Sequence, residues 1–400
     1  MVSGFSARAW GAAIVLSLAA MACERPAPDI AREKTRSLAS ERYAVGAASF
    51  GRYCALCHGV DATGYAADHA PSLVSATYLE SASDEMIARG IREGRPGTAM
   101  APYAKARGGP IDDDEIEALI TFLRERHPSR VRLPSTPIAG DIVRGEALFA
   151  ETCQRCHGSR LVRGDAVHLA NPALLSAASD AFLRYAIVHG HPGTPMPAFR
   201  DALSDQQVDD LVAFVRSWAT PPEPQRKALP EPPPLGPVVI NPRGPHPDFT
   251  LRDDRFVPIA DAKAALDAGK RMVIIDARAT SDWMVLRIPG SISIPYFLFD
   301  RLDQLPKDGT WITAYCACPH HASGAVIDEL RKRGFKHTAV LDEGILEWKK
   351  RNYPTESDPL PPPEPGQTQP ALIPMPTSRL PMLVPAARPV LTIPLGRKKP

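Results

Sequence analysis

Two short cysteine and histidine motifs dominate the chemistry that this sequence can carry. They read CALCH at 54–58 and CQRCH at 153–157, two copies of C-x-x-C-H. This spacing places two thiols on one turn of the backbone, where both can reach the vinyl groups of one porphyrin, and puts an imidazole next to them for the iron. We therefore expect two covalently bound haems c, attached through Cys54, Cys57, Cys153 and Cys156.

Two other interpretations of a C-x-x-C pair fit less well. A zinc site needs four ligands, whereas each motif brings three and has no second cysteine pair nearby. A thioredoxin-like redox motif is expected within a βαβ unit, and neither motif has that setting. Haem attachment remains the favoured chemistry.

The surroundings of the two motifs repeat as well. An aromatic residue stands four positions ahead of each first cysteine, Phe50 and Phe149, in a short helical pattern. Downstream, the loop GRPGTAMAPY at 94–103 is echoed by GHPGTPMPAF at 190–199. The period is 99 residues between the first cysteines and 96 between the loop methionines. Two tandem domains of one design follow from this repeat.

Each repeat closes with an expected amphipathic helix. Apolar residues recur at helical spacing over 112–126 and again over 204–218. Asp112 and Ser204 are good N-caps for these helices. Both repeats are therefore expected to be purely α-helical.

Residues 45–220 resemble a dihaem protein of two class I cytochrome c domains, 45–130 and 140–220. The resemblance implies that the helix leading into each haem motif crosses the C-terminal helix of its domain. It also implies proximal iron ligands, His58 and His157, and distal thioether ligands, Met100 and Met196. An iron with six ligands has no open position, so these domains are expected to transfer electrons rather than bind substrate.

Other side chains compete for the distal position. A methionine in such a loop can simply fill the core. Three histidines, His69, His189 and His191, are alternative ligands, although histidines there more often bind a propionate or face solvent. The matching Pro/Gly loops favour Met100 and Met196.

The last two cysteines lie in a different kind of sequence. Buried strands are predicted over 272–276, 311–315 and 338–341, with a helix over 324–333, which together indicate a parallel α/β sheet. Cys316 and Cys318 fall between a strand end and a helix start, followed by His320 and His321. Backbone N–H groups before a helix favour an anion and lower the pKa of a thiol there.

Residues 248–357 resemble a rhodanese domain, the sulfurtransferase family whose loop cysteine carries sulfur as a persulfide. The matching segments are IDAR at 275–278, IPGSI at 288–292, and the stretch from Leu341 to Trp348. The resemblance puts Cys316 in the catalytic position. The loop lacks the family's usual Gly and Arg, which places thiosulfate as a donor in doubt.

Three interpretations of this loop stay open. Cys316 carries a persulfide, with Cys318, His320 and His321 assisting; the two cysteines form a redox or metal-binding pair; or the domain is inactive and docks a partner. Asp276 and Arg278 are expected to form a structural pair, and Trp283 and Trp348 to lie in the core.

The ends and linkers follow from composition. Residues 1–23 read as an export signal whose Cys23 resembles the lipidated cysteine of bacterial lipoproteins; ordinary cleavage and an uncleaved anchor are the alternatives. Residues 24–44 would be a tether. Prolines concentrate in 221–247, predicted to be a semi-rigid spacer, and in 358–400, predicted to be a disordered tail.

The overall charge adds little. The net charge is only +2, which gives no reason to expect nucleic acid as a partner, and the longest apolar run is too short for a polytopic membrane protein.

The leading hypothesis is a periplasmic, lipid-anchored dihaem electron carrier that serves redox partners of a respiratory chain. Its rhodanese-like domain would handle a small sulfur compound as a sulfurtransferase or a sulfur-oxidising oxidoreductase. The alternatives are an electron carrier whose rhodanese-like domain only docks a partner, and a sulfurtransferase with passive haems.

Overall fold

The computed structural model describes residues 30–220, 234–317 and 320–358, with side chains from residue 38 onward. The export signal with Cys23, residues 221–233 of the spacer, Cys318 and the tail from residue 359 lie outside the described residues. Within the described ranges, no helix is both long enough and apolar enough to cross a membrane. Those residues up to 358 belong to one compact unit.

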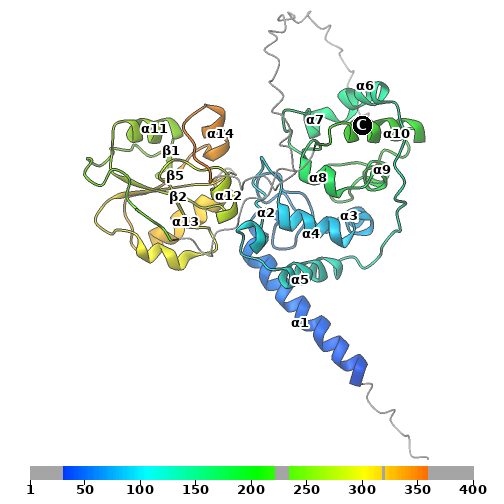
Figure 1. The fold of residues 1–400 in the computed structure, drawn as a ribbon, viewed down its shortest axis with the longest axis horizontal. Coiled ribbons are helices and arrows are strands. Elements are labelled where there is room, and N and C mark those ends of the chain that lie inside the picture. Colours follow the sequence, from blue (N-terminus) through cyan, green and yellow to red (C-terminus); the bar gives the residue numbers. More distant parts are fainter. Residues whose placement is uncertain (1–29, 221–233, 318–319, 359–400) are drawn as a thin grey trace, which may run out of the picture. The chain divides into compact units, whose positions relative to one another are not determined.

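The first helical domain is built on the crossing of two helices (Figure 1). Its elements are α1 (Ile30–Tyr53), α2 (Ala55–His58), α3 (Ala76–Ser81), α4 (Asp84–Glu93), the 3-10 turn η1 (Lys105–Arg107) and α5 (Asp113–Arg124). α1 packs across α5 at Gly46, where a Cβ atom would lie 2.0 Å from the Ala118 carbonyl oxygen. Glycine is therefore required for this close approach.

The second helical domain repeats this plan. Its elements are α6 (Ile142–Thr152), α7 (Gln154–His157), α8 (Pro172–Ala177), α9 (Asp180–His189) and α10 (Asp205–Arg216). α6 crosses α10 at Gly145, where a Cβ atom would lie 2.1 Å from the Asp210 carbonyl oxygen. The purely α-helical prediction for both repeats is confirmed.

Local capping explains where the C-terminal helices of both domains begin. Asp112 and Ser204 are their N-caps, and each forms a capping box with the residue three positions later, Glu115 and Gln207. The apolar faces predicted from the spacing are buried, including Leu119. The boundaries differ from the expected ones by one or two residues.

Most of the predicted tether is helical. From Ile30 onward it is part of α1, which continues without a break to Tyr53. Residues 30–44 are rich in Ala, Arg, Glu, Lys and Leu, which favour the helix, and contain neither Gly nor Pro. Local propensity therefore extends the helix well ahead of the haem motif.

The C-terminal domain is α/β, as predicted. Its strands are β1 (Phe256–Val257), β2 (Met272–Asp276), β3 (Ile292–Ser293), β4 (Trp311–Tyr315) and β5 (Thr338–Leu341). They form a parallel sheet in the order β1-β5-β4-β2-β3. Its helical elements are α11 (Ile259–Asp267), α12 (Thr280–Val285), η2 (Phe299–Gln304), α13 (His321–Lys332) and α14 (Gly344–Lys350).

Helices cover both faces of this sheet (Figure 1). Alternate residues of β2 enter two separate cores: Val273 packs with the cluster that includes α13, and Ile274 with the cluster that includes α11 and α14. A strand buried on both faces explains the continuous apolar run in its sequence. α13 starts three residues before its predicted start, directly after His320, whose φ is +72°.

Part of the predicted spacer belongs to this domain. Ile240 exchanges backbone hydrogen bonds with Met272 at the start of β2, with N···O distances of 2.8 and 3.2 Å. Arg271 N also donates to Pro245 O at 2.9 Å. Residues 240–245 are therefore packed against the sheet and are not spacer, because their backbone groups find partners at the end of β2.

Candidate functional site: two haem motifs and a sulfur loop

Each haem motif sits at the end of the first long helix of its domain. In α1 and α6 the helix ends at the residue before the first cysteine, and a one-turn helix then holds the second cysteine and the histidine. Cys57 and His58 therefore follow Cys54 on one turn, as the C-x-x-C-H spacing predicts. The backbone of the second motif has the same form.

The two motif histidines are oriented in the same way. His58 Nδ1 lies 2.9 Å from Pro71 O, and His157 Nδ1 lies 2.8 Å from Val167 O. A carbonyl oxygen can only accept, so Nδ1 carries the proton and Nε2 keeps a free lone pair for a metal. Burial lowers the pKa of both histidines, which keeps them neutral.

The motif cysteines are available for thioether bonds. In the described part of the chain, Cys54, Cys57, Cys153 and Cys156 are not engaged in disulfides. Burial raises the pKa of Cys54 to about 12, and burial together with the neighbouring Cys156 raises the pKa of Cys153 to about 11. In the part of the chain that the structure describes, no group of three or more His, Cys, Asp or Glu is arranged for a metal ion.

The two loop methionines are held by identical turns. Arg95 N donates to Met100 O at 2.7 Å, and His191 N donates to Met196 O at 3.0 Å. In each turn a threonine side chain accepts from the methionine N–H, at 3.1 Å in the first domain and 3.2 Å in the second. Both methionines are half-buried. Their roles as ligands stay predictions.

The rival histidines have other neighbours. His69 is 55% exposed, with Nε2 3.9 Å from an Asp165 carboxylate oxygen. Arg200 Nη2 donates to His189 Nδ1 at 2.6 Å, and the His189 ring stacks on Tyr185. His191 Nδ1 lies 3.5 Å from Ser75 Oγ, and burial, with a smaller contribution from His157, lowers the pKa of His191.

The donor set at each motif fits a c-type haem. Each motif offers two thiols on one turn and an imidazole with Nε2 free, and the same domain carries a methionine in a hydrogen-bonded loop. Such a group would supply one-electron chemistry at its iron.

The segment that joins β4 to α13, called the sulfur loop below, begins with Cys316 at the carboxyl end of β4. Cys316 is 1% exposed, its Sγ lies 3.3 Å from Ser323 Oγ on α13, and its carbonyl accepts from Ile345 N at 3.0 Å. Gly344 is required beside it, because a Cβ atom there would lie 2.3 Å from Cys316 O. Ser323 is a neighbour of Cys316 that sequence reasoning missed, since no motif singled it out.

The two loop histidines differ in their surroundings. His320 Nε2 lies 2.5 Å from Asp342 Oδ1, and its ring packs on Phe256. His321 is exposed at the start of α13. The contact with Asp342 holds His320 at the edge of the loop, where it can orient the backbone.

Asp276 and Arg278 form a buried ion pair, as expected. Arg278 Nη2 donates to Asp276 Oδ2 at 2.6 Å. Asp282 lies beside them, and burial raises its pKa to about 6. Trp348 is core, with 1% exposure, whereas Trp283, predicted to be core, is half-buried, and its indole N–H donates to the carbonyl of the buried Ser291 at 3.0 Å.

The rhodanese-like domain packs on the first haem motif. α13, which begins after the sulfur loop, lies against α2, and Leu56 and Ala99 pack against the core cluster that contains Cys316. Beside this contact, Tyr296 donates to Tyr53 O at 2.5 Å, and its hydroxyl lies 3.2 Å from that of Tyr103.

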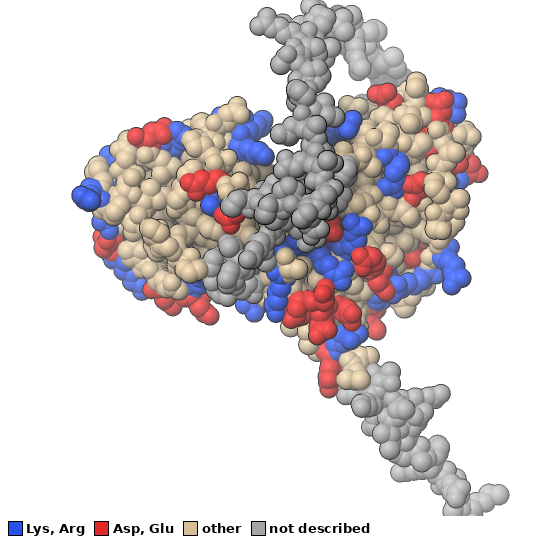
Figure 2. All heavy atoms as spheres, viewed as in Figure 1, with Lys and Arg blue, Asp and Glu red and all other residues tan. Residues whose placement is uncertain are grey.

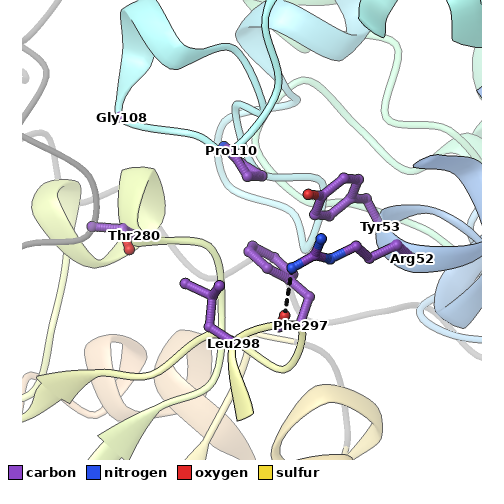
Figure 3. Close-up of a pocket in the computed structure, with 7 residues that line it drawn as sticks. All are labelled: Arg52, Tyr53, Gly108, Pro110, Thr280, Phe297 and Leu298. Carbon is purple, nitrogen blue, oxygen red and sulfur yellow. Dashed lines mark hydrogen bonds between the residues drawn. The ribbon is translucent and has the colours of Figure 1, made fainter. Parts of the chain in front are cut away.

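A pocket of about 190 Å³ opens at the same boundary (Figure 3). Arg52 Nη2 spans it and donates to Phe297 O at 3.2 Å. The residues that line it are Arg52, Tyr53, Gly108, Pro110, Thr280, Phe297 and Leu298.

Comparison with known proteins identifies both parts of the chain. Residues 41–123 and 140–215 match the family of cytochrome c oxidase, cbb3-type, subunit III, and residues 259–351 match the rhodanese-like domain. Cytochrome c6 of Thermosynechococcus vestitus is 32% identical over 99 residues, which cover 22% of this chain and 85% of that protein.

Two larger relatives match over part of their length. Dihydro-heme d1 dehydrogenase of Pseudomonas aeruginosa is 35% identical over 149 residues, 32% of this chain and 30% of the relative. The probable adenylyltransferase/sulfurtransferase MoeZ of Mycobacterium tuberculosis is 32% identical over 92 residues, 22% of this chain and 23% of the relative. The chain thus spans less than a third of either protein. It belongs to the c-type cytochromes, with tandem cytochrome c domains joined to a rhodanese-like domain.

Proposed function

We propose that this protein is a dihaem electron carrier whose rhodanese-like domain delivers electrons from a sulfur compound. Cys54, Cys57 and His58 would hold the first haem, with Met100 as its distal ligand. Cys153, Cys156, His157 and Met196 would hold the second. When bound, each iron exchanges one electron between its ferric and ferrous states.

One observation carries this proposal: α13, the helix that follows the sulfur loop, and the first haem motif share a packed boundary. α13 lies against α2, and Leu56 of the motif packs against the cluster that contains Cys316. This packing joins the two domains on the side of the first haem motif. It supports exchange of electrons between them over two unrelated activities.

The chemistry of a Cys316 persulfide can supply the electrons. Four-electron oxidation of its outer sulfur, with oxygen from three waters, releases sulfite and six protons and restores the Cys316 thiolate. The sulfur–sulfur bond breaks in this step and three sulfur–oxygen bonds form. The two haems would accept the four electrons singly and pass them on to the proposed redox partner, so that each haem is used twice.

A second function is favoured by a specific observation. Cys316 is only 1% exposed, and Ser323 Oγ lies 3.3 Å from its sulfur. A sulfur atom enclosed in this way suits a domain that no longer meets a substrate and instead docks a partner. This alternative predicts an electron carrier without sulfur chemistry.

The partner and location belong to the proposal as well. The matched oxidase subunit family supports a redox partner in a respiratory chain, and a lipidated Cys23 would hold the protein at a membrane on the periplasmic side. Figure 2 shows basic and acidic side chains interspersed over the face in view. A mixed surface of this kind favours shape and short-range contacts over long-range steering in partner choice.

A haem spectrum tests the proposal. The oxidised full-length protein is mixed with sulfide, thiosulfate or glutathione persulfide, and the reduced-minus-oxidised difference spectrum is followed. We expect reduction by at least one donor in the wild type and its loss in Cys316→Ser. Dithionite must reduce both proteins equally, which shows that the variant keeps its haems.

The outcomes separate the functions. Equal reduction of the wild type and Cys316→Ser would contradict the role of Cys316. No reduction by any donor would favour the docking function, and sulfur transfer to cyanide without a haem response would favour a sulfurtransferase with passive haems. A pyridine haemochrome count other than two per chain would contradict the dihaem assignment.

A further inference from the structure

The two haem loops differ in length, and the extra residues carry a charge. From His58 to the carbonyl of Pro71 that accepts its Nδ1–H there are 13 positions, whereas from His157 to Val167 there are 10. This difference of 3 residues equals the difference between the repeat period measured on the first cysteines, 99 residues, and that measured on the loop methionines, 96 residues. The longer loop of the first domain contains Asp68.

Asp68 is paired with an arginine from the other domain. Arg163 Nη1 lies 3.1 Å from both carboxylate oxygens of Asp68, and Arg163 Nη2 donates to Asp68 O at 2.6 Å. The Arg163 side chain is 26% exposed and the Asp68 side chain 17%. Such a forked, partly desolvated pair is stronger and more directional than a surface ion pair.

Each partner is tied to a haem site. Asp68 Oδ2 accepts from the backbone N–H of Ala99 at 3.3 Å, and Ala99 directly precedes Met100. Arg163 is bridged to Gly158, the residue that follows His157. The contact therefore connects the distal loop of the first site to the proximal loop of the second.

The backbone at Asp68 is held in a conformation that needs support. Asp68 and His69 have φ values of +48° and +52°, in the left-handed region that residues other than glycine rarely adopt. Such strained residues persist only where surrounding contacts hold them. Arg163 supplies one of these contacts through Asp68 O, beside the hydrogen bonds from Tyr65 N to Ala70 O and from Ala70 N to Ala67 O within the loop.

We propose that Arg163 of the second domain is a positioning residue for the distal ligand of the first haem. Through Asp68 and Ala99 it holds the Met100 loop closed, so the first haem site is complete only when the second domain is docked on it. This inference rests on Met100 being the distal ligand, which belongs to the proposed function.

Binding of imidazole to the full-length, haem-loaded ferric protein tests it. Imidazole competes with a loosely held methionine, and the weak red absorption of ferric iron bound by a thioether disappears as it binds. In Arg163→Gln we expect one of the two haems to bind imidazole about tenfold more tightly, because a charge-assisted contact is lost. Asp68→Asn should have the same effect.

Two further variants sharpen the result. Arg163→Lys keeps the charge but not the fork, so it should give a smaller increase. Arg160→Gln is the matched control, because Arg160 lies in the same loop and is exposed; its imidazole affinity should equal that of the wild type. The haem count and the circular dichroism of each variant establish that both domains are folded.

Failure of the inference and failure of its premise look different. If Met100→Ala keeps the full red absorption of the wild type, Met100 is not a ligand and the premise is wrong. If Met100→Ala removes about half of that absorption while Arg163→Gln binds imidazole as the wild type does, Met100 is a ligand and the role of Arg163 is wrong. An increase in the affinity of the second haem alone in Arg163→Gln would overturn the inference as well.

Discussion

The two cytochrome c domains share their local structure but pack against different parts of the chain. Both cross their helices at a glycine, both orient the motif histidine through a carbonyl, and both hold the loop methionine in the same threonine turn. The first domain, however, contacts α13 and Tyr296 of the rhodanese-like domain, and Asp68 in its longer loop pairs with Arg163 of the second domain.

The exposure of the motifs reflects this difference. His58 is buried and Cys57 half-buried, whereas His157 is half-buried and Cys156 exposed. A less hydrated, more constrained site changes the balance between ferric and ferrous iron, since solvent access and polarity set the potential. Repetition of a motif therefore does not imply two equivalent redox centres.

The largest loss of stability is expected at the helix crossing, which both domains share. Gly46→Ala and Gly145→Ala each place a methyl group against a helix carbonyl, at 2.0 and 2.1 Å, and should cost about 2–3 kcal/mol of unfolding free energy. Gly51→Ala is the control, because a Cβ there meets nothing within 4 Å; it should stabilise α1 by about 0.5–1 kcal/mol. Urea unfolding measures all three. Equal stability of Gly46→Ala and Gly51→Ala would contradict the close crossing.

The next largest effect is a pH-dependent loss of stability that is expected in the second domain and not in the first. Asp210 accepts hydrogen bonds from Arg144 Nε at 2.8 Å and Asp141 N at 2.7 Å, and these bonds lower its pKa from 3.8 to about 2. The first domain has Ala118 at this position of the crossing. A lowered pKa stabilises the folded state above about pH 4, and this contribution is lost as the pH falls from about 4 to about 2.

Asp210→Asn measures that contribution. At pH 7 it should destabilise the second domain by about 1–3 kcal/mol, because a charged acceptor is lost, and the difference from the wild type should shrink toward pH 2. Asp201→Asn, at an exposed position, is the control and should be neutral. A cost of Asp210→Asn that does not change with pH would contradict the ion pair as its source.

The smallest effect concerns the boundary with the rhodanese-like domain. Tyr103→Phe removes the hydroxyl that lies 3.2 Å from that of Tyr296 and should cost about 1 kcal/mol in urea unfolding. The second repeat has Phe199 at the corresponding place, so Phe199→Tyr should change stability by less than about 0.5 kcal/mol. If the two substitutions had equal effects, the boundary would not depend on the Tyr103 hydroxyl.

Elements of secondary structure were predictable where their signals are local. The capped helices beginning after Asp112 and Ser204, and the buried strands of the sheet, follow from N-cap residues and apolar spacing within a few turns. The helical form of the tether was not predicted, because its charge content was considered while the helix propensity over 30–44 that continues α1 was not. The packed part of the spacer was missed because proline content hides the backbone partners that Ile240 finds on β2.

The sequence by itself determined which motifs the chain carries and in what order, because each C-x-x-C-H motif is five consecutive residues and Cys316 directly follows a strand. Only the tertiary structure decided what those motifs touch. Arg163 and Asp68 are 95 positions apart, and Tyr296 and Tyr103 are 193 apart. Such pairs meet only when folded surfaces pack, and no spacing along the chain records that packing.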